Sequence, residues 1–320
     1  MGPSEAYFDH LNYFPPPVKR AAYSDRTAWI MAKCSEAAYR SGNELYEKLA
    51  SGKFVEITTF NNPDTDTQAF LAVADDFAVL AFRGTEKNLR DIWTDLNARF
   101  YRVRDEAYHD GFAKAYLSVK EQIQSSLEEI THKPLYITGH SLGGALATLA
   151  ALDLERDSLA ACYTFGSPRV GSTKLDWNIK CPVYRVVNAT DIVARMPLML
   201  MGYRHVGSLY YLTRKANLLR SPHAFRMIHR FVWSTIRYLT WLATLPFSRF
   251  SNAPGHDHQN DDHDKLSLAP PPLRDHGIRH YVTKLDKIAE ERQIRGKTSL
   301  KDIGISQKTK VETKKITDEV

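Results

Sequence analysis

Between residues 134 and 145 the chain reads PLYITGHSLGGA. Its first five residues form a short apolar run typical of a buried strand, and the Ala- and Leu-rich stretch at 141–154 predicts a helix. Residues 139–143 match the pattern G-x-S-x-G at the junction of the two. In this context the pattern predicts a tight strand-to-helix turn that strains the backbone of Ser141 and leaves its hydroxyl standing clear at the carboxyl edge of a sheet. The N–H of Leu142, at the start of the helix, can receive a developing oxyanion.

Further predicted elements lie on both sides of this turn. A capped helix pattern begins at Ser24-Asp25, and helical spacing of apolar residues recurs from 111 to 130. Strand patterns occupy residues 54–60, 69–74, 77–82, 159–165 and 183–187, with a hairpin turn at 61–64. Strands and helices joined by short connections are typical of α/β folds, so we expect an α/β fold with a mainly parallel central sheet flanked by helices.

The composition is that of a globular protein. The chain has 320 residues, of which 43% are hydrophobic, enough for one large domain or two small ones. It has too little Gly and Pro for a collagen, too many apolar residues for a disordered chain and too few cysteines for a disulfide scaffold. The net charge of +6 is mild and localised, which argues against a nucleic-acid partner.

The cysteines and the first residues bear on the location of the protein. Cys34, Cys162 and Cys181 are odd in number, and two of them lie in apolar strand-like runs, so we expect buried free thiols and a reducing compartment. Residues 1–17 lack a basic stretch followed by an apolar one, which argues against a Sec signal peptide. Both observations predict a cytoplasmic protein, with peripheral association to a membrane left open.

The chain divides into one large domain with a segment at each end. An N-terminal extension at 1–22 is rich in Pro and aromatic residues and is expected to wrap the surface. The predicted α/β domain covers residues 23–292 and contains a basic, apolar insertion at about 214–265. The tail at 293–320, rich in Lys, Thr and Glu, is expected to be disordered.

Five blocks of sequence resemble one family in the order of that family. They are VLAFRGT at 79–85, HDGF at 109–112, GHSLGGA at 139–145, TFGSPRVG at 164–171 and NATDIV at 188–193. These blocks are similar to the oxyanion loop, the start of the next helix, the serine turn, the strand after it and the acid-bearing loop of the class 3 (fungal-type) lipases. The resemblance covers roughly residues 25–215 and implies an α/β-hydrolase fold.

Carried over residue by residue, this resemblance implies Ser141 as the nucleophile and Asp191 as the acid of a catalytic triad. It implies Thr85, together with Leu142, as the donors of the oxyanion hole. A carboxylate just past a buried strand, as Asp191 is, can orient a histidine and stabilise its imidazolium. Two alternatives stay open: Asp191 as a loop-capping residue, and Thr85 as a turn residue whose neighbour supplies the N–H.

The histidine of the triad has to follow Asp191 if the order is Ser, Asp, His. The resemblance points to His276, within Asp275-His276 and ahead of Tyr281, because the family often places its base in a short loop before the last helix. His280 is the alternative, since it lies four residues further on and could share a helical face. His205 is expected to support a strand at 208–212 instead.

The family carries its lid after the oxyanion loop, here at residues 86–96. Leu89, Ile92 and Trp93 lie there among charged residues, in the pattern of a short amphipathic helix. Such a helix could cover the serine in water and turn its apolar face to lipid. A surface helix with its apolar side in the core explains the pattern equally well.

The insertion has an unusual charge distribution, because residues 192–256 contain nine basic residues and no Asp or Glu. A predicted helix there carries a basic stripe flanked by aromatic residues, namely Arg226, Arg230, Trp233, Arg237 and Trp241. A helix of this kind fits peripheral contact with an anionic membrane better than a spanning segment. The alternative is a helix packed on the domain with its basic side in water.

Together these features predict a serine hydrolase that cleaves carboxylic esters of lipids, as a triacylglycerol lipase does, through an acyl-enzyme on Ser141. A phospholipase A1 or an acyltransferase would use the same chemistry. From a different class, a lipid-binding or scaffolding protein could keep the fold with a silent site. No cofactor is implied, and no metal, because the His- and Asp-rich residues 256–264 are typical of a solvated loop.

Overall fold

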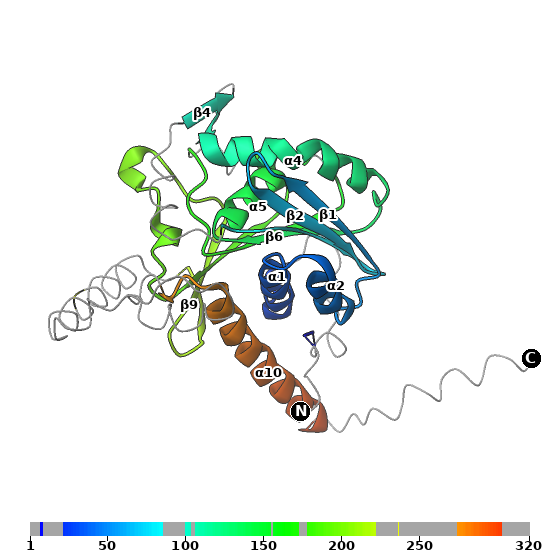
Figure 1. Cartoon of the computed structure of the whole chain (residues 1–320). Coiled ribbons are helices and arrows are strands. Elements are labelled where there is room, and N and C mark those ends of the chain that lie inside the picture. Colours follow the sequence, from blue (N-terminus) through cyan, green and yellow to red (C-terminus); the bar gives the residue numbers. More distant parts are fainter. Residues whose placement is uncertain are drawn as a thin grey trace, which may run out of the picture.

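The structure is a computed structural model that describes residues 7–8, 22–85, 100–103, 106–154, 156–172, 178–221, 236 and 274–302. Within these residues the strands form an eight-stranded sheet in the order β1-β2-β3-β6-β7-β8-β9-β10 (Figure 1). The five strands of its centre run parallel: β3 (Ala78–Phe82), β6 (Leu135–His140), β7 (Leu159–Phe165), β8 (Val183–Asn188) and β9 (Ser208–Leu212). The prediction of a mainly parallel central sheet is confirmed.

Antiparallel strands extend both edges of this sheet. At one edge lie β1 (Glu56–Asn62) and β2 (Thr67–Val73), and at the other β10 (Leu218–Arg220) pairs with β9. A separate hairpin of β4 (Phe100–Val103) and β5 (Glu106–His109) was not predicted, nor were two short 3-10 helices, η2 (Val193–Arg195) and η3 (Met199–Met201). Elements of three or four residues are too short for a periodic pattern to predict.

Helices cover both faces of the sheet (Figure 1). On one face lie α1 (Asp25–Ala37), α2 (Gly42–Ala50) and α10 (Ile278–Asp302), and on the other lie α4 (Asp110–Glu128) and α5 (Leu142–Asp153). Each face therefore has its own hydrophobic core, and Ser141 lies where the central strand β6 meets α5, in the layer that covers one of these faces.

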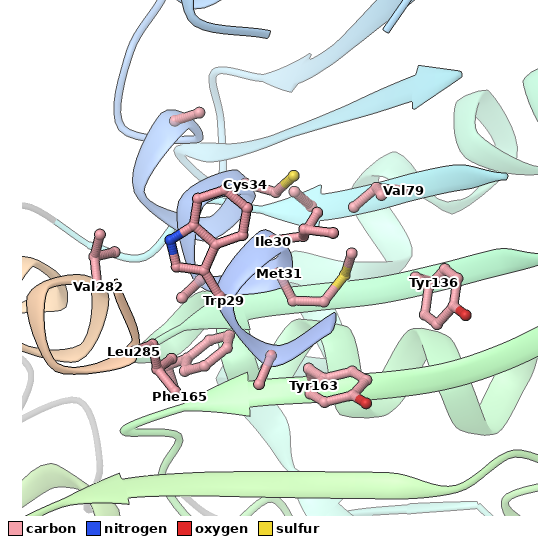
Figure 2. Close-up of a cluster of buried hydrophobic side chains, with 14 of the residues drawn as sticks. Trp29, Ile30, Met31, Cys34, Val79, Tyr136, Tyr163, Phe165, Val282 and Leu285 are labelled. Carbon is pink, nitrogen blue, oxygen red and sulfur yellow. The ribbon is translucent and has the colours of Figure 1, made fainter. Parts of the chain in front are cut away.

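Helix α1 links the sheet to α10. It begins as predicted, with the side chain of Ser24 accepting a hydrogen bond from the N–H of Thr27. Figure 2 shows side chains of α1 between the sheet residues Val79, Tyr136 and Tyr163 and the α10 residues Val282 and Leu285. Burying a large apolar side chain contributes about 1.5–3 kcal/mol, so this layer fixes α10 against the domain.

Several predicted boundaries need correction. Residues 61 and 62, expected in a hairpin turn, continue β1, and the turn lies at 63–66, where Asp66 has a φ of 51°. The prediction that the extension 1–22 wraps the surface is not among these corrections: of its described residues, Phe8 is buried and packs edge-on against Trp29 and Phe54. Residues 214–220, assigned to the insertion, form the hairpin that adds β10 to the sheet.

The C-terminal helix also differs from the prediction. Helix α10 runs through Asp302, well into the segment expected to be a disordered tail. Residues 289–295 are strong helix formers, so a helix anchored by its first turns can continue into solvent. Residues 303–320 and most of the predicted insertion lie outside the described residues. No helix in the described part of the chain is long and apolar enough to cross a membrane.

Candidate active site

Ser141 lies in the turn between β6 and α5 that the sequence predicts. Its backbone has φ 56° and ψ −127°, a strained conformation for a residue with a side chain. The serine turn, residues 139–143, is tight enough that a Cβ on Gly139 would collide with the carbonyl of Gly143. Glycine is therefore required there by close approach of the backbone. The turn places the Ser141 side chain at the carboxyl end of a central parallel strand.

The structure brings Ser141, His276 and Asp191 together from three separate loops. The Oγ of Ser141 lies 2.8 Å from Nε2 of His276, and Nδ1 of the same ring lies 3.0 Å from both carboxylate oxygens of Asp191. Asp191 follows β8, and His276 precedes α10. All three side chains are buried, whereas His280, the alternative base, is exposed on α10.

The Asp191 carboxylate is surrounded by hydrogen-bond donors. Tyr281 donates to Oδ2 at 2.5 Å, and the backbone N–H groups of Val193 and Ala194 donate to Oδ1 at 2.9 and 3.4 Å. Burial by itself would raise the pKa of Asp191, but the His276 ring and the Tyr281 hydroxyl hold the pKa below its ordinary value. Asp191 is therefore a carboxylate near neutral pH.

The two loops that carry Asp191 and His276 are tied to each other. The carboxylate of Asp275 accepts hydrogen bonds from the N–H and hydroxyl of Thr190, at 2.9 and 2.5 Å. The backbone carbonyl of Asp275 accepts another from the Asn188 side chain at 2.8 Å. Asp275 is next to His276, and Thr190 is next to Asp191. These hydrogen bonds therefore fix the distance between the two loops.

Gly166, at the end of β7, shows how closely these groups pack. It has a φ of 58°, and an added Cβ would lie 2.5 Å from Oδ2 of Asp191 and 3.0 Å from Nδ1 of His276. No larger residue fits there without moving the carboxylate.

The far side of the Asp191 loop is held by two basic side chains. Nε2 of His205 lies 2.7 Å from the carbonyl of Ala194, and the Arg169 guanidinium donates to the carbonyls of Arg195 and Pro197. Burial, and then neighbouring arginines, lower the pKa of His205 well below its usual range, so its ring is neutral and donates to the carbonyl. The sequence suggested that His205 supports a strand. In the structure its side chain is hydrogen-bonded to the loop that carries Asp191.

The residues expected at the oxyanion hole lie beside the serine. Leu142 is the first residue of α5, and Thr85 lies in the segment that follows β3. This segment packs against the serine turn: a Cβ on Gly84 would lie 2.6 Å from the carbonyl of His140, and one on Gly143 would collide with the carbonyl of Phe82. The segment that carries Thr85 is therefore packed directly against the serine turn from which α5 begins.

The remaining predicted site residues lie outside the part of the chain that the structure describes. The lid candidates Leu89, Ile92 and Trp93 lie outside the described residues, as do the membrane-contact candidates Arg226, Arg230, Trp233, Arg237 and Trp241. The His- and Asp-rich residues 256–264 also fall outside them. Across the described ranges, no group of three or more His, Cys, Asp or Glu side chains could hold a metal ion.

A serine on a strand-to-helix turn, with a buried acid and a histidine from later loops of a mainly parallel sheet, defines the class as a serine hydrolase with the α/β-hydrolase fold. The sequence pattern of the family described as "Lipase (class 3)" matches residues 79–201. The chain belongs to the class 3 lipase family and is a carboxylic ester hydrolase.

Relatives and a solved structure that are named as lipases support this assignment. The chain is 31% identical over 233 residues to the secreted mono- and diacylglycerol lipase A of Penicillium cyclopium, covering 68% of this chain and 75% of that protein. It is 38% identical over 112 residues to the secreted mono- and diacylglycerol lipase 1 of Fusarium solani, covering 32% and 34%. The solved structure of Rhizomucor miehei triacylglyceride lipase superposes with a TM-score of 0.54 at 26% identity, covering 62% of this chain and 85% of that one.

The expected cytoplasmic location is wrong, because related lipases are named as secreted enzymes and point to an extracellular location. The error lies in the inference from cysteines. Cys34, Cys162 and Cys181 are all free and buried. Burial raises the pKa of the Cys34 and Cys162 thiols and shields them from oxidants, so the unpaired state of these thiols does not report the compartment.

Proposed function

We propose that Ser141 attacks the carbonyl carbon of a lipid ester while Nε2 of His276 takes the proton of its hydroxyl. The imidazolium then returns that proton to the leaving alcohol, which departs and leaves an acyl-enzyme on Ser141. Water then attacks the acyl group while the same ring takes its proton, and the ring returns this proton to the Ser141 oxygen as the carboxylic acid leaves. The observation that carries this proposal is the 2.8 Å approach of Ser141 Oγ to His276 Nε2 within the strained turn.

Asp191 orients the ring and stabilises its charged form. Its carboxylate accepts from Nδ1, which leaves Nε2 free to accept the serine proton. The N–H groups of Thr85 and Leu142 receive the negative charge that develops on the substrate oxygen. Residues 23–292 form the hydrolase domain in this proposal.

We assign acylglycerols as the substrate class, because named relatives act on mono- and diacylglycerols and a solved neighbour is a triacylglyceride lipase. Phospholipase A1 and acyltransferase activities would use the same acyl-enzyme. A hydrolysis panel of short-chain esters, mono-, di- and triacylglycerols and phospholipids separates these activities. We also propose that the protein acts outside the cell, because related lipases are named as secreted enzymes.

Labelling by a fluorophosphonate tests the catalytic assignment directly, because the reagent reacts only with an activated serine. Wild type is expected to become labelled, whereas Ser141→Ala is expected to lose labelling and at least about 10³-fold in kcat while staying folded. Ser125→Ala, at an exposed position on α4, is the matched control. Retained hydrolysis in folded Ser141→Ala would overturn the assignment, and an unlabelled wild type would favour a lipid-binding protein with a silent site.

We further propose that the face next to the Asp191 loop contacts an anionic lipid surface. Leu198, Leu200 and Met201, which follow this loop, are 50%, 96% and 39% exposed. Residues 193–221 contain five basic residues and no Asp or Glu. Exposed apolar side chains in a segment that contains basic residues and no acidic ones suit the interface of an anionic bilayer, and they would bring the serine to its substrate.

A further inference from the structure

The buried side chain of His140, the residue before Ser141, has two hydrogen-bond contacts of its own. Its Nδ1 lies 2.8 Å from the hydroxyl of Tyr39, and its Nε2 lies 2.7 Å from the backbone carbonyl of His276. A carbonyl oxygen can only accept, so Nε2 carries the hydrogen and donates it. The two contacts join the turn after α1, the serine turn and the loop of the catalytic histidine.

The His140 ring is uncharged where it meets His276. Burial, and then repulsion from His276, lower the pKa of His140 to about 3. A neutral ring with its hydrogen on Nε2 leaves Nδ1 as an acceptor, so the hydroxyl of Tyr39 donates to it. The centroids of the two histidine rings are only 4.6 Å apart. A cation at His140 would oppose the imidazolium that His276 forms, whereas a neutral donor does not.

Tyr39 also lies against the loop that carries Thr85. A Cβ on Gly84 would collide with the Tyr39 hydroxyl. One side chain therefore contacts both the loop before the oxyanion donor and the ring that holds the base. A series of contacts consequently runs around Ser141 from one side of the site to the other, through Gly84, Tyr39, His140 and the main chain of His276.

We propose that His140 and Tyr39 are positioning residues, which hold the main chain of His276 so that Nε2 stays at the oxygen of Ser141. The inference rests on the proposed roles of Ser141 and His276. Neither positioning residue exchanges a proton with substrate. They act through the backbone carbonyl of the catalytic histidine, and an error of about 1 Å in the position of that ring lowers turnover by about 10²-fold.

The test compares substitutions that remove one contact at a time. Tyr39→Phe removes only the hydroxyl, His140→Leu removes both ring nitrogens, and His140→Gln retains an amide N–H that can reach the carbonyl of His276. Tyr46→Phe and His132→Leu, at exposed positions, are the matched controls. The measurements are kcat and KM for p-nitrophenyl butyrate, the rate of fluorophosphonate labelling and the melting temperature.

His140→Leu is expected to lower kcat about 100-fold and Tyr39→Phe about 10-fold, both with KM changed less than about 2-fold. His140→Gln is expected to keep kcat within about 5-fold of wild type, and the controls to keep it unchanged. If His140→Leu does not fold, the kcat of Tyr39→Phe alone tests the positioning role. The inference is overturned if folded Tyr39→Phe keeps wild-type kcat and labelling rate, or if His140→Gln and His140→Leu lose kcat equally. If wild type is neither labelled nor active, the proposed function fails instead.

Discussion

The hydroxyl of Tyr281 donates a hydrogen bond of 2.5 Å to Oδ2 of Asp191. Tyr281 lies in the first turns of α10, close after His276, so the helix that follows the proposed base also binds the acid. The same hydroxyl accepts the backbone N–H of Asn188 at 3.0 Å. Burial, and then the charge of Asp191, raise the pKa of Tyr281 well above its usual range, which keeps the hydroxyl protonated as a donor.

Tyr281→Phe is therefore expected to lower kcat by about 10-fold, because a hydrogen bond to a charged group is lost and the carboxylate is oriented less firmly. Loss of a donor to the charged form also raises the pKa of Asp191, so the acid limb of the pH profile of kcat should move to higher pH. Steady-state hydrolysis of a soluble ester between pH 4 and 9 measures both effects.

Tyr116→Phe is the matched control for this substitution. Its hydroxyl also donates to a carboxylate, that of Asp153, at 2.8 Å, but on the opposite face of the sheet from α10. It is expected to alter stability without altering kcat or the acid limb. An unchanged profile in folded Tyr281→Phe would show that the backbone donors alone orient Asp191.

Replacing the two histidines near the start of α10 tests which of them is the base. His276→Ala is expected to lose at least about 10³-fold in kcat, as Ser141→Ala does, because a triad fails as a unit. His280→Ala should stay within about 3-fold of wild type, since this residue is exposed and lies outside the contacts of Ser141. If the two losses are reversed, the base is His280.

Local sequence pattern was sufficient for one part of this site and insufficient for another. The serine turn could be predicted because strand, turn and helix are consecutive, and the glycines that permit the turn lie within residues 139–144. The position of His276 depended on a resemblance, because 85 residues separate it from Asp191. No periodic pattern relates Tyr39 to His140, which are 101 residues apart and meet only when α1 packs on the sheet.

Local sequence pattern likewise predicted some helices and strands and missed others. Strand β7 was predicted with its observed limits, because a buried central strand is a continuous apolar run. The end of α10 was missed, because a polar helix that extends from the domain has the composition of a disordered segment. Hydrogen-bonded loops such as 188–195 depend on partners from three other segments, namely Arg169, His205 and Asp275, and sequence spacing does not encode those partners.

The neutral state of His140 predicts a specific loss of stability in acid. Its pKa is about 3 in the folded protein and 6.5 in an unfolded chain, so between these values the unfolded state binds more protons. The contribution of His140 to the free energy of unfolding is fully present above pH about 6.5. As the pH falls below that value, this contribution decreases by up to about 1.4 kcal/mol per pH unit.

Urea unfolding from pH 7 to 4 measures this slope in wild type and in His140→Gln, which cannot take up the proton. The wild type is expected to lose stability more steeply than the variant, and His132→Gln, at an exposed position, is expected to follow the wild type. Parallel slopes for wild type and His140→Gln would mean that the ring is already charged in the folded protein.

The exposed side chain of Leu200 tests contact with lipid apart from catalysis. Leu200→Ser is expected to reduce co-sedimentation with anionic phosphatidylglycerol vesicles and to lower the rate on emulsified triacylglycerol about 5-fold, because an apolar group that would enter the bilayer is lost. The rate on soluble p-nitrophenyl butyrate should not change, since Leu200 is 96% exposed. Val55→Ser, which removes an apolar side chain that is 73% exposed at the start of the sheet, is the matched control. Equal vesicle binding by wild type, Leu200→Ser and Val55→Ser would contradict the contact, and binding that is insensitive to salt would exclude the electrostatic part of it.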